Sequence, residues 1–426
     1  MNKFTGKKLL ILGGPTPCCK VVEEAKEMGI YTIVTDMNPN APAKKLADEA
    51  LPFSVTDAEN IVAWCHENPI DGVVNFCVGL AQNAQQKVSR EFGLPCYGSE
   101  EQYRILTQKQ EFKKLCVENN VDIIKTFKNG NEVADSDFPV FVKPADSSGS
   151  RGSTICENRS QLLQAMKEAQ SESTTGQIII EKYMEDYQDL TVTYIVKNGE
   201  SMLISIGDRY HGLIQDGLEQ QLACTIQPSR YADMYMQYVN ERVVKMIKNL
   251  GIKNGPVFMQ GFVDENTVRF YDPAIRFPGN DYELIYKKAT GISPMRSIIT
   301  YAMGSEIDDY SGKMKGSFDL NGLCAVQYII NLGEGEIGIF EGLNEIRKLP
   351  FVLDVKQRYF QGEKVRQTGD VRQRGGEISI LIERNSKKIK EAIDSIQPLL
   401  KVTDTEGNNM LVSAFDSNIV LRQYKE

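Results

Sequence analysis

The sequence has few of the side chains that metal and nucleophilic catalysis usually need. Its 426 residues include two histidines and one tryptophan. Zinc sites and Ser-His-Asp triads both depend on histidine, so the sequence disfavours these two classes of enzyme. The nine cysteines form no Cys-x-x-Cys pair, and the adjacent Cys18 and Cys19 cannot both face one metal. We therefore expect reduced thiols and a cytoplasmic protein.

Long apolar runs are also absent. A membrane-spanning helix needs about 18 consecutive apolar residues, and the run Leu9–Leu12 is too short even for the core of a signal peptide. The net charge of −8 gives little attraction to nucleic acid or anionic lipid. We expect neither as a partner. With 41% apolar and 25% charged residues, the composition is that of a globular protein, and the length predicts about two to four domains.

The first hundred residues alternate between strand and helix patterns. This alternation predicts βαβ units and a parallel sheet. The expected strands are 8–12, 31–35 and 73–76, and the expected helices begin near Cys18 and cover 61–67 and 82–92.

The pattern changes after about residue 105. Strand-like runs separated by glycine and polar turns become frequent, and the segment 313–426 carries more hairpin-like runs. The expected strands are 140–143, 153–156, 178–181, 190–196 and 202–206, with a hairpin of 257–263 and 268–272. The expected helices are 111–119, 160–170, 231–249 and 387–399.

A glycine- and serine-rich loop follows the strand that carries Lys143. The segment Phe141–Ser153 reads FVKPADSSGSRGS. Glycines let a backbone approach a phosphate, successive N–H groups can surround its oxygens, and the lysine supplies a mobile charge. The loop lacks the Gly-Lys-Ser/Thr ending of a P-loop. A flexible hairpin loop without a ligand is the alternative interpretation.

Two further segments are suited to a nucleotide, each with a simpler alternative. The segment Ile178–Met184 is a strand that ends in charged and then apolar residues, which suits adenine, and nearby acids suit ribose. A strand end at the surface is the alternative. Thr107–Lys113 begins a helix whose Lys109 would reach a phosphate only if that helix lies against the same cleft. A solvated lysine is the alternative.

The fourth segment is the predicted hairpin from Gln260 to Arg276. Gln260 and Asp272 fall on its two strands, and Ala274 and Arg276 alternate to the side of Asp272. Oxygen ligands on paired strands suit Mg²⁺ that bridges phosphates, and the arginine suits a phosphoryl or carboxylate oxygen. A solvated hairpin face is the alternative.

In chain order, the four segments resemble the ATP-grasp superfamily, in particular the branch of biotin carboxylase, the purine-biosynthetic ATP-grasp enzymes and the L-amino acid ligases. The resemblance covers nearly the whole chain and implies an α/β fold in three parts. These are a Rossmann-like N-terminal domain at 1–105, a two-lobed α+β ATP-grasp core at 106–305 with a lid at about 118–190, and a C-terminal α+β subdomain at 306–426.

The resemblance also implies roles for individual residues. The implied ATP-binding residues are Lys109, Lys143, Ser147, Ser148, Gly149, Ser150, Gly152, Glu181, Lys182, Tyr183, Met184 and Asp189. The implied catalytic residues are Lys143, Asp272 and Arg276. Asp272 would hold Mg²⁺ with Gln260, and the substrate contacts are Arg276, Asp208, Arg209, Gly279 and Asn280.

The chain departs from the family pattern at the metal position. Where the family has Glu, Glu, Asn and Arg, this sequence has Gln260, Asp272, Ala274 and Arg276. Losing one carboxylate and one carbonyl should weaken metal binding. Mg²⁺ keeps several waters and relies on substrate phosphates, so ATP with Mg²⁺ remains the expected cofactor pair.

The implied reaction is ATP-dependent joining of a carboxylate to an amine through an acyl phosphate, with release of ADP and phosphate. Two alternatives remain open: a nucleotide-binding regulatory or scaffold protein without catalysis, and a carboxylase-type relative that uses bicarbonate. The expected partners are small-molecule carboxylates and amines, and the resemblance is compatible with a homodimer. The sequence does not identify the substrates or the pathway.

Overall fold

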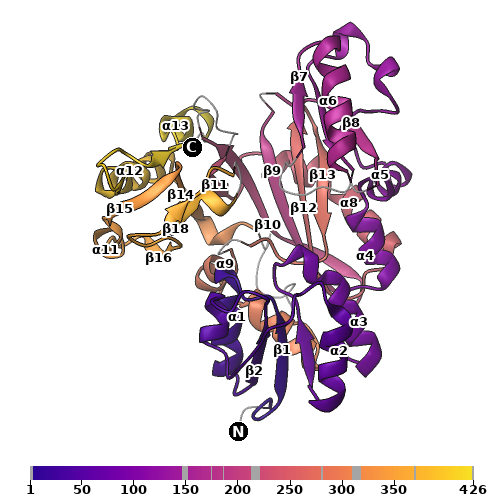
Figure 1. Ribbon diagram of the computed structural model, residues 1–426, viewed down its shortest axis with the longest axis vertical. Helices are drawn as coiled ribbons and strands as arrows, with labels where there is room; N and C mark the ends of the chain where they lie inside the picture. The colour runs from indigo at the N-terminus through magenta and orange to yellow at the C-terminus, as the bar shows by residue number, and fades with distance from the viewer. Residues whose placement is uncertain are drawn as a thin grey trace.

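The computed structural model describes residues 3–145, 152–173, 175–185, 187–212, 221–279, 282–308, 318–368 and 371–424. These residues form a mixed α/β protein with several sheets. In Figure 1 the N-terminal elements lie at the bottom, a small lobe stands at the top, and the C-terminal elements lie to the left of a long central sheet. No helix among the described residues is both long and apolar enough to cross a bilayer.

The N-terminal part is a parallel sheet flanked by helices, as predicted. Its strands follow the order β3-β2-β1-β4. The side chains of β1 from Leu9 to Leu12 are fully buried, which is typical of a parallel strand with both faces covered. The strands are β1 (Lys8–Leu12), β2 (Tyr31–Thr35), β3 (Glu49–Leu51) and β4 (Gly72–Val74), and the helices are α1 (Thr16–Glu27), α2 (Ala58–Glu67) and α3 (Gln82–Phe92).

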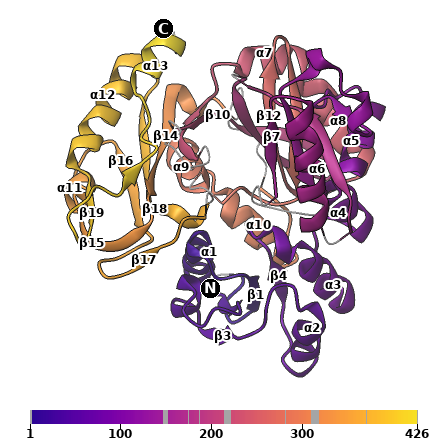
Figure 2. The same cartoon turned by 45° about the horizontal axis from the view of Figure 1, so that its top comes forward.

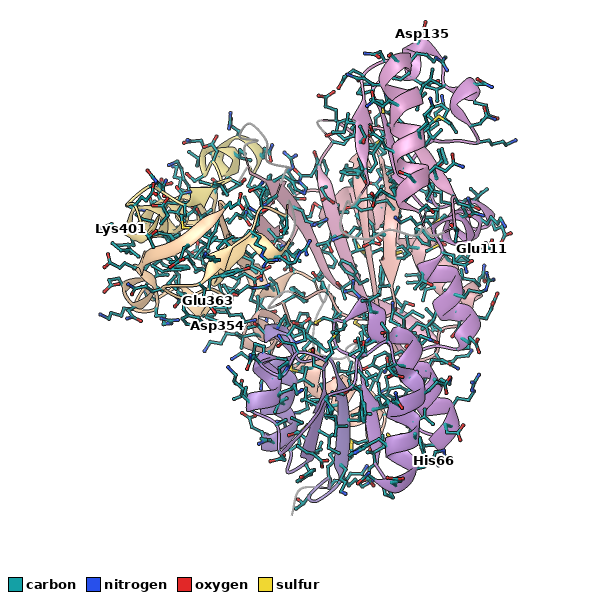
Figure 3. The ribbon with its side chains drawn as sticks, viewed as in Figure 1. His66, Glu111, Asp135, Asp354, Glu363 and Lys401 are labelled. Carbon is teal, nitrogen blue, oxygen red and sulfur yellow. The ribbon has the colours of Figure 1, made fainter. Side chains whose placement is uncertain are left out.

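The upper lobe is a second small sheet covered by one helix. Its order is β5-β8-β6-β7, and Val140, Val142, Leu162, Ala165 and Ile180 form part of its apolar core. Asp135 marks its outer tip in Figure 3. The elements are β5 (Thr126–Phe127), β6 (Val140–Pro144), β7 (Thr154–Cys156), α6 (Arg159–Glu172) and β8 (Ile178–Lys182). The helices α4 (Glu100–Thr107) and α5 (Lys109–Glu118) lead into the lobe.

The largest sheet extends across the protein. Its order is β13-β12-β9-β10-β11-β14-β18-β16. The pairing of β11 with β14 joins the segment before residue 306 to the segment after it, so one sheet continues across the boundary expected at 305. The strands are β9 (Asp189–Lys197), β10 (Glu200–His211), β11 (Leu222–Gln227), β12 (Gly255–Asp264), β13 (Thr267–Ala274), β14 (Leu323–Leu332), β16 (Val352–Gln357) and β18 (Arg374–Glu383), with β20 (Leu411–Val412) beside β14.

The single long helix expected over 231–249 is wrong, because the chain forms two helices. α7 (Ala232–Tyr238) and α8 (Asn240–Leu250) are separated at Val239. The Tyr194 hydroxyl donates to Asn240 Oδ1 at 2.8 Å and contacts the Tyr235 hydroxyl at 2.7 Å. Valine and asparagine are weak helix formers, and the asparagine side chain has this partner outside the helix.

The remaining elements connect and cover the sheets. The sequence patterns did not predict α9 (Tyr282–Thr290) and α10 (Pro294–Ala302), which lie between the large sheet and the N-terminal part (Figure 2). The other elements are α11 (Leu343–Ile346), α12 (Ser386–Ile396) and α13 (Asn418–Gln423), together with the small sheet β17-β15-β19 of β15 (Gly335–Glu341), β17 (Lys364–Val365) and β19 (Lys401–Asp404).

Polar contacts join the N-terminal part to the rest of the protein. Glu24 on α1 accepts from Arg296 Nε at 2.5 Å and from Lys287 Nζ at 2.9 Å. Lys20 Nζ lies 3.9 Å from Asp354 Oδ2 on β16, and Figure 3 shows Asp354 on the side of the C-terminal elements nearest the N-terminal part. These contacts link α1 of the N-terminal part to α9 and α10 on one side and to β16 on the other.

Candidate active site

One face of the large sheet carries an unusual run of polar side chains, which we call the polar face. Residues directly opposite each other on paired strands share a face, as do residues two apart on one strand. One row across the strands β9-β10-β11-β14-β18 is Asp189, Arg209, Thr225, Gln327 and Ser379. A second row, across β13-β12-β9-β10, is Asp272, Gln260, Thr191 and Gly207. Such a face buried inside a protein indicates a site for a polar ligand.

Above this face, a buried carboxylate joins two lysines. Lys143 Nζ on β6 lies 2.5 Å from Glu181 Oε2 on β8, and Lys113 Nζ on α5 donates to Glu181 Oε1 and Thr126. The Glu181 side chain is 4% exposed. Burial opposes its ionisation, but the charges of Lys143 and Lys113 outweigh that effect and lower its pKa. The cluster therefore holds a concentrated positive charge near the sheet.

Lys109, Lys143 and Asp272 lie close enough for their charges to interact. Desolvation and the charge of Lys143 lower the pKa of Lys109, while Glu181 and Asp272 partly offset them. Desolvation raises the pKa of Asp272, and the cations Arg276, Lys109, Arg209 and Lys143 oppose that rise. The Asp272 side chain is accessible to solvent although protein atoms surround it closely. Lys143 and Asp272 thus lie close enough for the charge of the lysine to act on the carboxyl group.

The hairpin places the expected metal residues side by side. Gln260 pairs directly with Asp272, and Ala274 pairs with Phe258 further along. Ala274 is buried and provides no side-chain oxygen. Arg276 Nη1 donates to the Phe277 carbonyl at 2.9 Å, and its guanidinium lies 5.6 Å from the Phe258 ring. Its Nε has no hydrogen-bond partner among the described residues. Arg276 is thus held by its own loop, and its Nε–H is available to a ligand.

The donor set suits a cation that binds mainly through substrate phosphates. Within the described ranges, no three His, Cys, Asp or Glu side chains gather into a metal site. Asp272 and Gln260 offer one carboxylate and one amide. The adjacent Thr191 Oγ1 is buried and has no hydrogen-bond partner in the part of the chain that the structure describes. Mg²⁺ commonly uses one or two carboxylates and completes its shell with water and phosphate. The residues present therefore fit Mg²⁺ held by a nucleotide.

Asp189 belongs to a buried cluster. Its Oδ2 accepts from Arg209 Nη1 at 2.7 Å, and its Oδ1 accepts from the Tyr271 hydroxyl at 3.2 Å. His211 Nε2 lies 3.7 Å from the same Oδ2, but Arg209 already neutralises that oxygen. Burial and the charge of Arg209 therefore dominate, and they lower the pKa of His211 to about 4. His211 is neutral at pH 7.

Several predicted site residues are not brought to the polar face. Asp208 is fully buried on the opposite face, where it accepts from Ser229 Oγ at 2.5 Å and from the Tyr424 hydroxyl. This placement is a correction, because neighbours in a strand point to opposite faces and Arg209 takes the polar one. Lys182 Nζ donates to the carbonyl of Asp137 at 2.9 Å, on the outer side of the lobe.

The remaining predicted residues lie in the upper lobe, beside Cys77 or outside the described residues. The Tyr183 backbone N–H donates to the Pro139 carbonyl at 3.1 Å, and Met184 follows it, half-buried. Gly152 has a φ of +70°, and Gly279 lies beside Cys77, whose Sγ would be 3.8 Å from a Cβ on that glycine. The predicted residues Ser147, Ser148, Gly149, Ser150 and Asn280 lie outside the described residues.

Sequence reasoning missed part of the cluster. Lys113 follows Lys109 by four residues on α5, so the two share a helix face, and this spacing was a readable signal. Tyr271 reaches Asp189 because β12 and β13 change register between Gln260 and Gly261, which no local pattern predicts. A surface hollow of about 420 Å³ lies elsewhere, lined by Leu94, Asn198, Tyr301, Glu306 and their neighbours. It contains no lysine or arginine and is not part of this site.

Comparisons with known proteins find sequence similarity over the segment that carries most of these residues. Residues 104–272 match the family described as the ATP-binding domain of the carbamoyl-phosphate synthase L chain. A formate-dependent phosphoribosylglycinamide formyltransferase of Prochlorococcus marinus is 28% identical over 277 residues, which are 61% of this chain and 68% of the relative.

Solved structures show the same fold. A phosphoribosylglycinamide synthetase from Anaerococcus prevotii superposes with a TM-score of 0.75 at 19% identity, over 94% of this chain and 100% of that one. An L-amino acid ligase from Bacillus licheniformis gives a TM-score of 0.76 at 19% identity, over 94% and 99%.

Proposed function

We propose that this chain is an ATP-grasp protein and, more narrowly, an ATP-dependent ligase that joins a carboxylate to an amine. One observation carries the proposal. Lys143 and Lys109, which lie near Glu181, act on the charge of Asp272. Arg276 and Arg209 act on the same carboxyl group. Together these cations can hold a triphosphate and a carboxylate.

The lysines bind the phosphates of ATP in this proposal. Lys143 and Lys109 approach Asp272, whereas Lys113 is held by Glu181 and Thr126. Lys143 exchanges its contact with Glu181 for a phosphate oxygen when the nucleotide binds. Tyr183 and Met184 follow β8, where adenine would stack.

The protein promotes the reaction mainly by positioning charge. A substrate carboxylate oxygen attacks the γ-phosphorus in line, the bond to the β-phosphate oxygen breaks, and ADP leaves. The amine then attacks the acyl carbon and releases phosphate. Arg276 and Lys143 neutralise the oxygens that gain charge. Mg²⁺ held at Asp272 and Gln260 would neutralise the phosphate chain. Excluding water protects the acyl phosphate from hydrolysis.

A non-catalytic nucleotide-binding protein is the second candidate, and Gln260 with Ala274 is the observation that favours it. Release of ADP, measured with candidate carboxylates alone and with amines, separates the two functions. A ligase gives ADP release that depends on both substrates. Measurable ATP affinity without any stimulated ADP release would reject the ligase. Release that depends on bicarbonate would instead identify the carboxylase alternative.

A further inference from the structure

We propose that Cys18 and Cys77 form a pair of thiols that a peroxide oxidises to a disulfide. The pair is thus a site of reversible modification at one edge of the N-terminal sheet, apart from the residues assigned to ATP. The proposal concerns the chemistry of the two thiols and does not rest on the ligase function.

The order of the N-terminal strands brings the two cysteines together. β1 and β4 are parallel neighbours, with Ile11 opposite Val74. Cys18 lies in the first turn of α1, which follows β1, and Cys77 lies in the loop that follows β4. Both segments leave the sheet at the same edge, because the carboxyl ends of parallel strands meet there. The Cys18 thiol donates a hydrogen bond to the Cys77 sulfur.

Hydrogen bonds fix the loop that carries Cys77. Asn75 Nδ2 donates to the Val78 carbonyl at 3.0 Å, and the Val78 N–H donates to Asn75 Oδ1 at 3.0 Å. The Phe277 N–H donates to the Phe76 carbonyl at 3.0 Å. Cys77 therefore has a fixed place beside the segment that follows β13.

The surroundings of Cys77 favour its thiolate, which is the nucleophilic form of cysteine. The hydrogen bond from Cys18 lowers the pKa of Cys77, and burial opposes that effect. The charges of three basic side chains lower the same pKa further: Arg276, Lys356 and Arg358. Cys77 is half-buried, so a small oxidant has access to it.

Contacts between segments account for these charges. A Cβ on Gly79 would lie 3.7 Å from Arg276 Nε, which places this guanidinium beside the loop of Cys77. Lys20 Nζ on α1 lies 3.9 Å from Asp354 Oδ2 on β16, and β16 also carries Lys356. The cations therefore approach Cys77 from two separate parts of the chain.

Cys18 has the opposite character. Its hydrogen bond to Cys77, its burial and the charge of Asp36 raise the pKa of Cys18. The Gly14 N–H donates to Asp36 Oδ2 at 2.9 Å, so this carboxylate lies close to the start of α1. Cys18 is fully buried. One thiol is therefore reactive and accessible, and the other lies behind it in the protonated form.

The two thiols have different parts in the reaction. The Cys77 thiolate attacks one oxygen of the peroxide, an S–O bond forms as the O–O bond breaks, and the hydroxide that leaves takes a proton from solvent. The Cys18 sulfur then attacks the sulfur of the resulting sulfenic acid. An S–S bond forms, the S–O bond breaks, and the hydroxide leaves with the Cys18 proton as water. With hydrogen peroxide, two thiols are oxidised and one peroxide is reduced to two waters.

The first experiment maps the bond in the full chain. The protein is treated with hydrogen peroxide at pH 7, unfolded, alkylated with iodoacetamide and digested with trypsin. We expect mass spectrometry to show the peptide of Cys18 joined to the peptide of Cys77, and dithiothreitol should separate them. These two peptides also contain Cys19 and Cys65, so Cys19→Ser and Cys65→Ser are the matched controls and should still form the bond. Burial raises the pKa of Cys65 to about 11, which makes it a poor nucleophile at pH 7.

Two results of this mapping would overturn the proposal. One is the recovery of Cys18 and Cys77 as alkylated thiols after exposure to peroxide. The other is a disulfide that joins Cys18 to Cys19. Neither result depends on turnover, so the ligase function is judged separately by the release of ADP.

The second experiment assigns the attacking thiol. Cys77→Ser should lose free thiols to peroxide at least about tenfold more slowly than the wild-type protein, because the remaining cysteines lack the neighbouring cations. Cys18→Ala should stop the reaction at a sulfenic acid on Cys77, which dimedone captures. Cys18→Ser keeps the shape of the side chain and repeats the test if the alanine variant does not fold. Equal oxidation rates in the wild-type protein and in folded Cys77→Ser would reject the assignment.

Discussion

Replacing Lys143 by alanine should separate the phosphate-binding lysine from the lysine that only positions Glu181. Lys143 contacts Glu181 at 2.5 Å and acts on Asp272. Lys113 contacts the same carboxylate and Thr126, and it is not among the main charges that act on Asp272. We therefore expect Lys143→Ala to weaken ATP binding and Lys113→Ala to change it by no more than about threefold.

The magnitude follows from the bond that is lost. A hydrogen bond between charged groups contributes about 1.5–3 kcal/mol, and each 1.4 kcal/mol is about tenfold in affinity. Lys143 must leave Glu181 to reach a phosphate, which offsets part of that gain. A loss of ten- to hundredfold in ATP affinity is the expected result, measured by calorimetry with Mg²⁺ present. Equal losses in the two variants, or no loss in Lys143→Ala, would refute the assignment.

The same pair predicts a shift in acid stability. The native pKa of Glu181 is lowered, so its contribution to stability is present above the unfolded value of about 4.3 and is lost as the pH falls through the lower native value. Either variant leaves Glu181 buried with one lysine, which raises its native pKa. Urea unfolding should therefore show each variant losing stability at a higher pH than the wild-type protein does.

Four further variants test other parts of the site. Asp272→Asn should remove most ADP release and keep the fold, as shown by circular dichroism; unchanged release would place the metal elsewhere. Gln260→Glu should lower the Mg²⁺ concentration for half-maximal ATP binding, and no change would mean that position 260 does not face the ion. Because the native pKa of His211 is about 4 and the unfolded one about 6.5, the protein should lose up to about 3 kcal/mol as the pH falls between these values; His211→Gln should abolish that loss, and an unaltered pH profile would contradict the buried neutral form. Glu24→Gln should destabilise the protein by about 1–3 kcal/mol in urea unfolding, because Arg296 and Lys287 lose a charged acceptor, while Glu23→Gln on the exposed side of α1 serves as the control.

Local patterns predicted most of the elements that carry the site. Apolar residues repeat about every two positions in strands and every 3.6 positions in helices. These repeats predict the βαβ alternation, the strand that bears Lys143 and the hairpin that bears Gln260 and Asp272. The convergence of Lys143 and Asp272 followed from the order of motifs, which the family resemblance supplied.

The rest depends on contacts between distant segments. The side of the sheet that Arg374 takes depends on the register shift at Gly375, and the Asp189 cluster requires the shift that frees Tyr271. The division of the predicted long helix at Val239 requires Tyr194, which lies 46 residues from Asn240. None of these features leaves a periodic signal in its own segment, because each is selected by a partner far away in the chain.

The continuous sheet also has a consequence for the stiffness of the protein. Asp272 stands on β13 and Arg374 on β18, and hydrogen-bonded strands at a spacing of about 4.8 Å connect the two. Such a framework stretches very little, so side chains on the strands from β13 to β18 keep fixed distances from one another. A ligand that contacts several of these strands must therefore match a preset spacing.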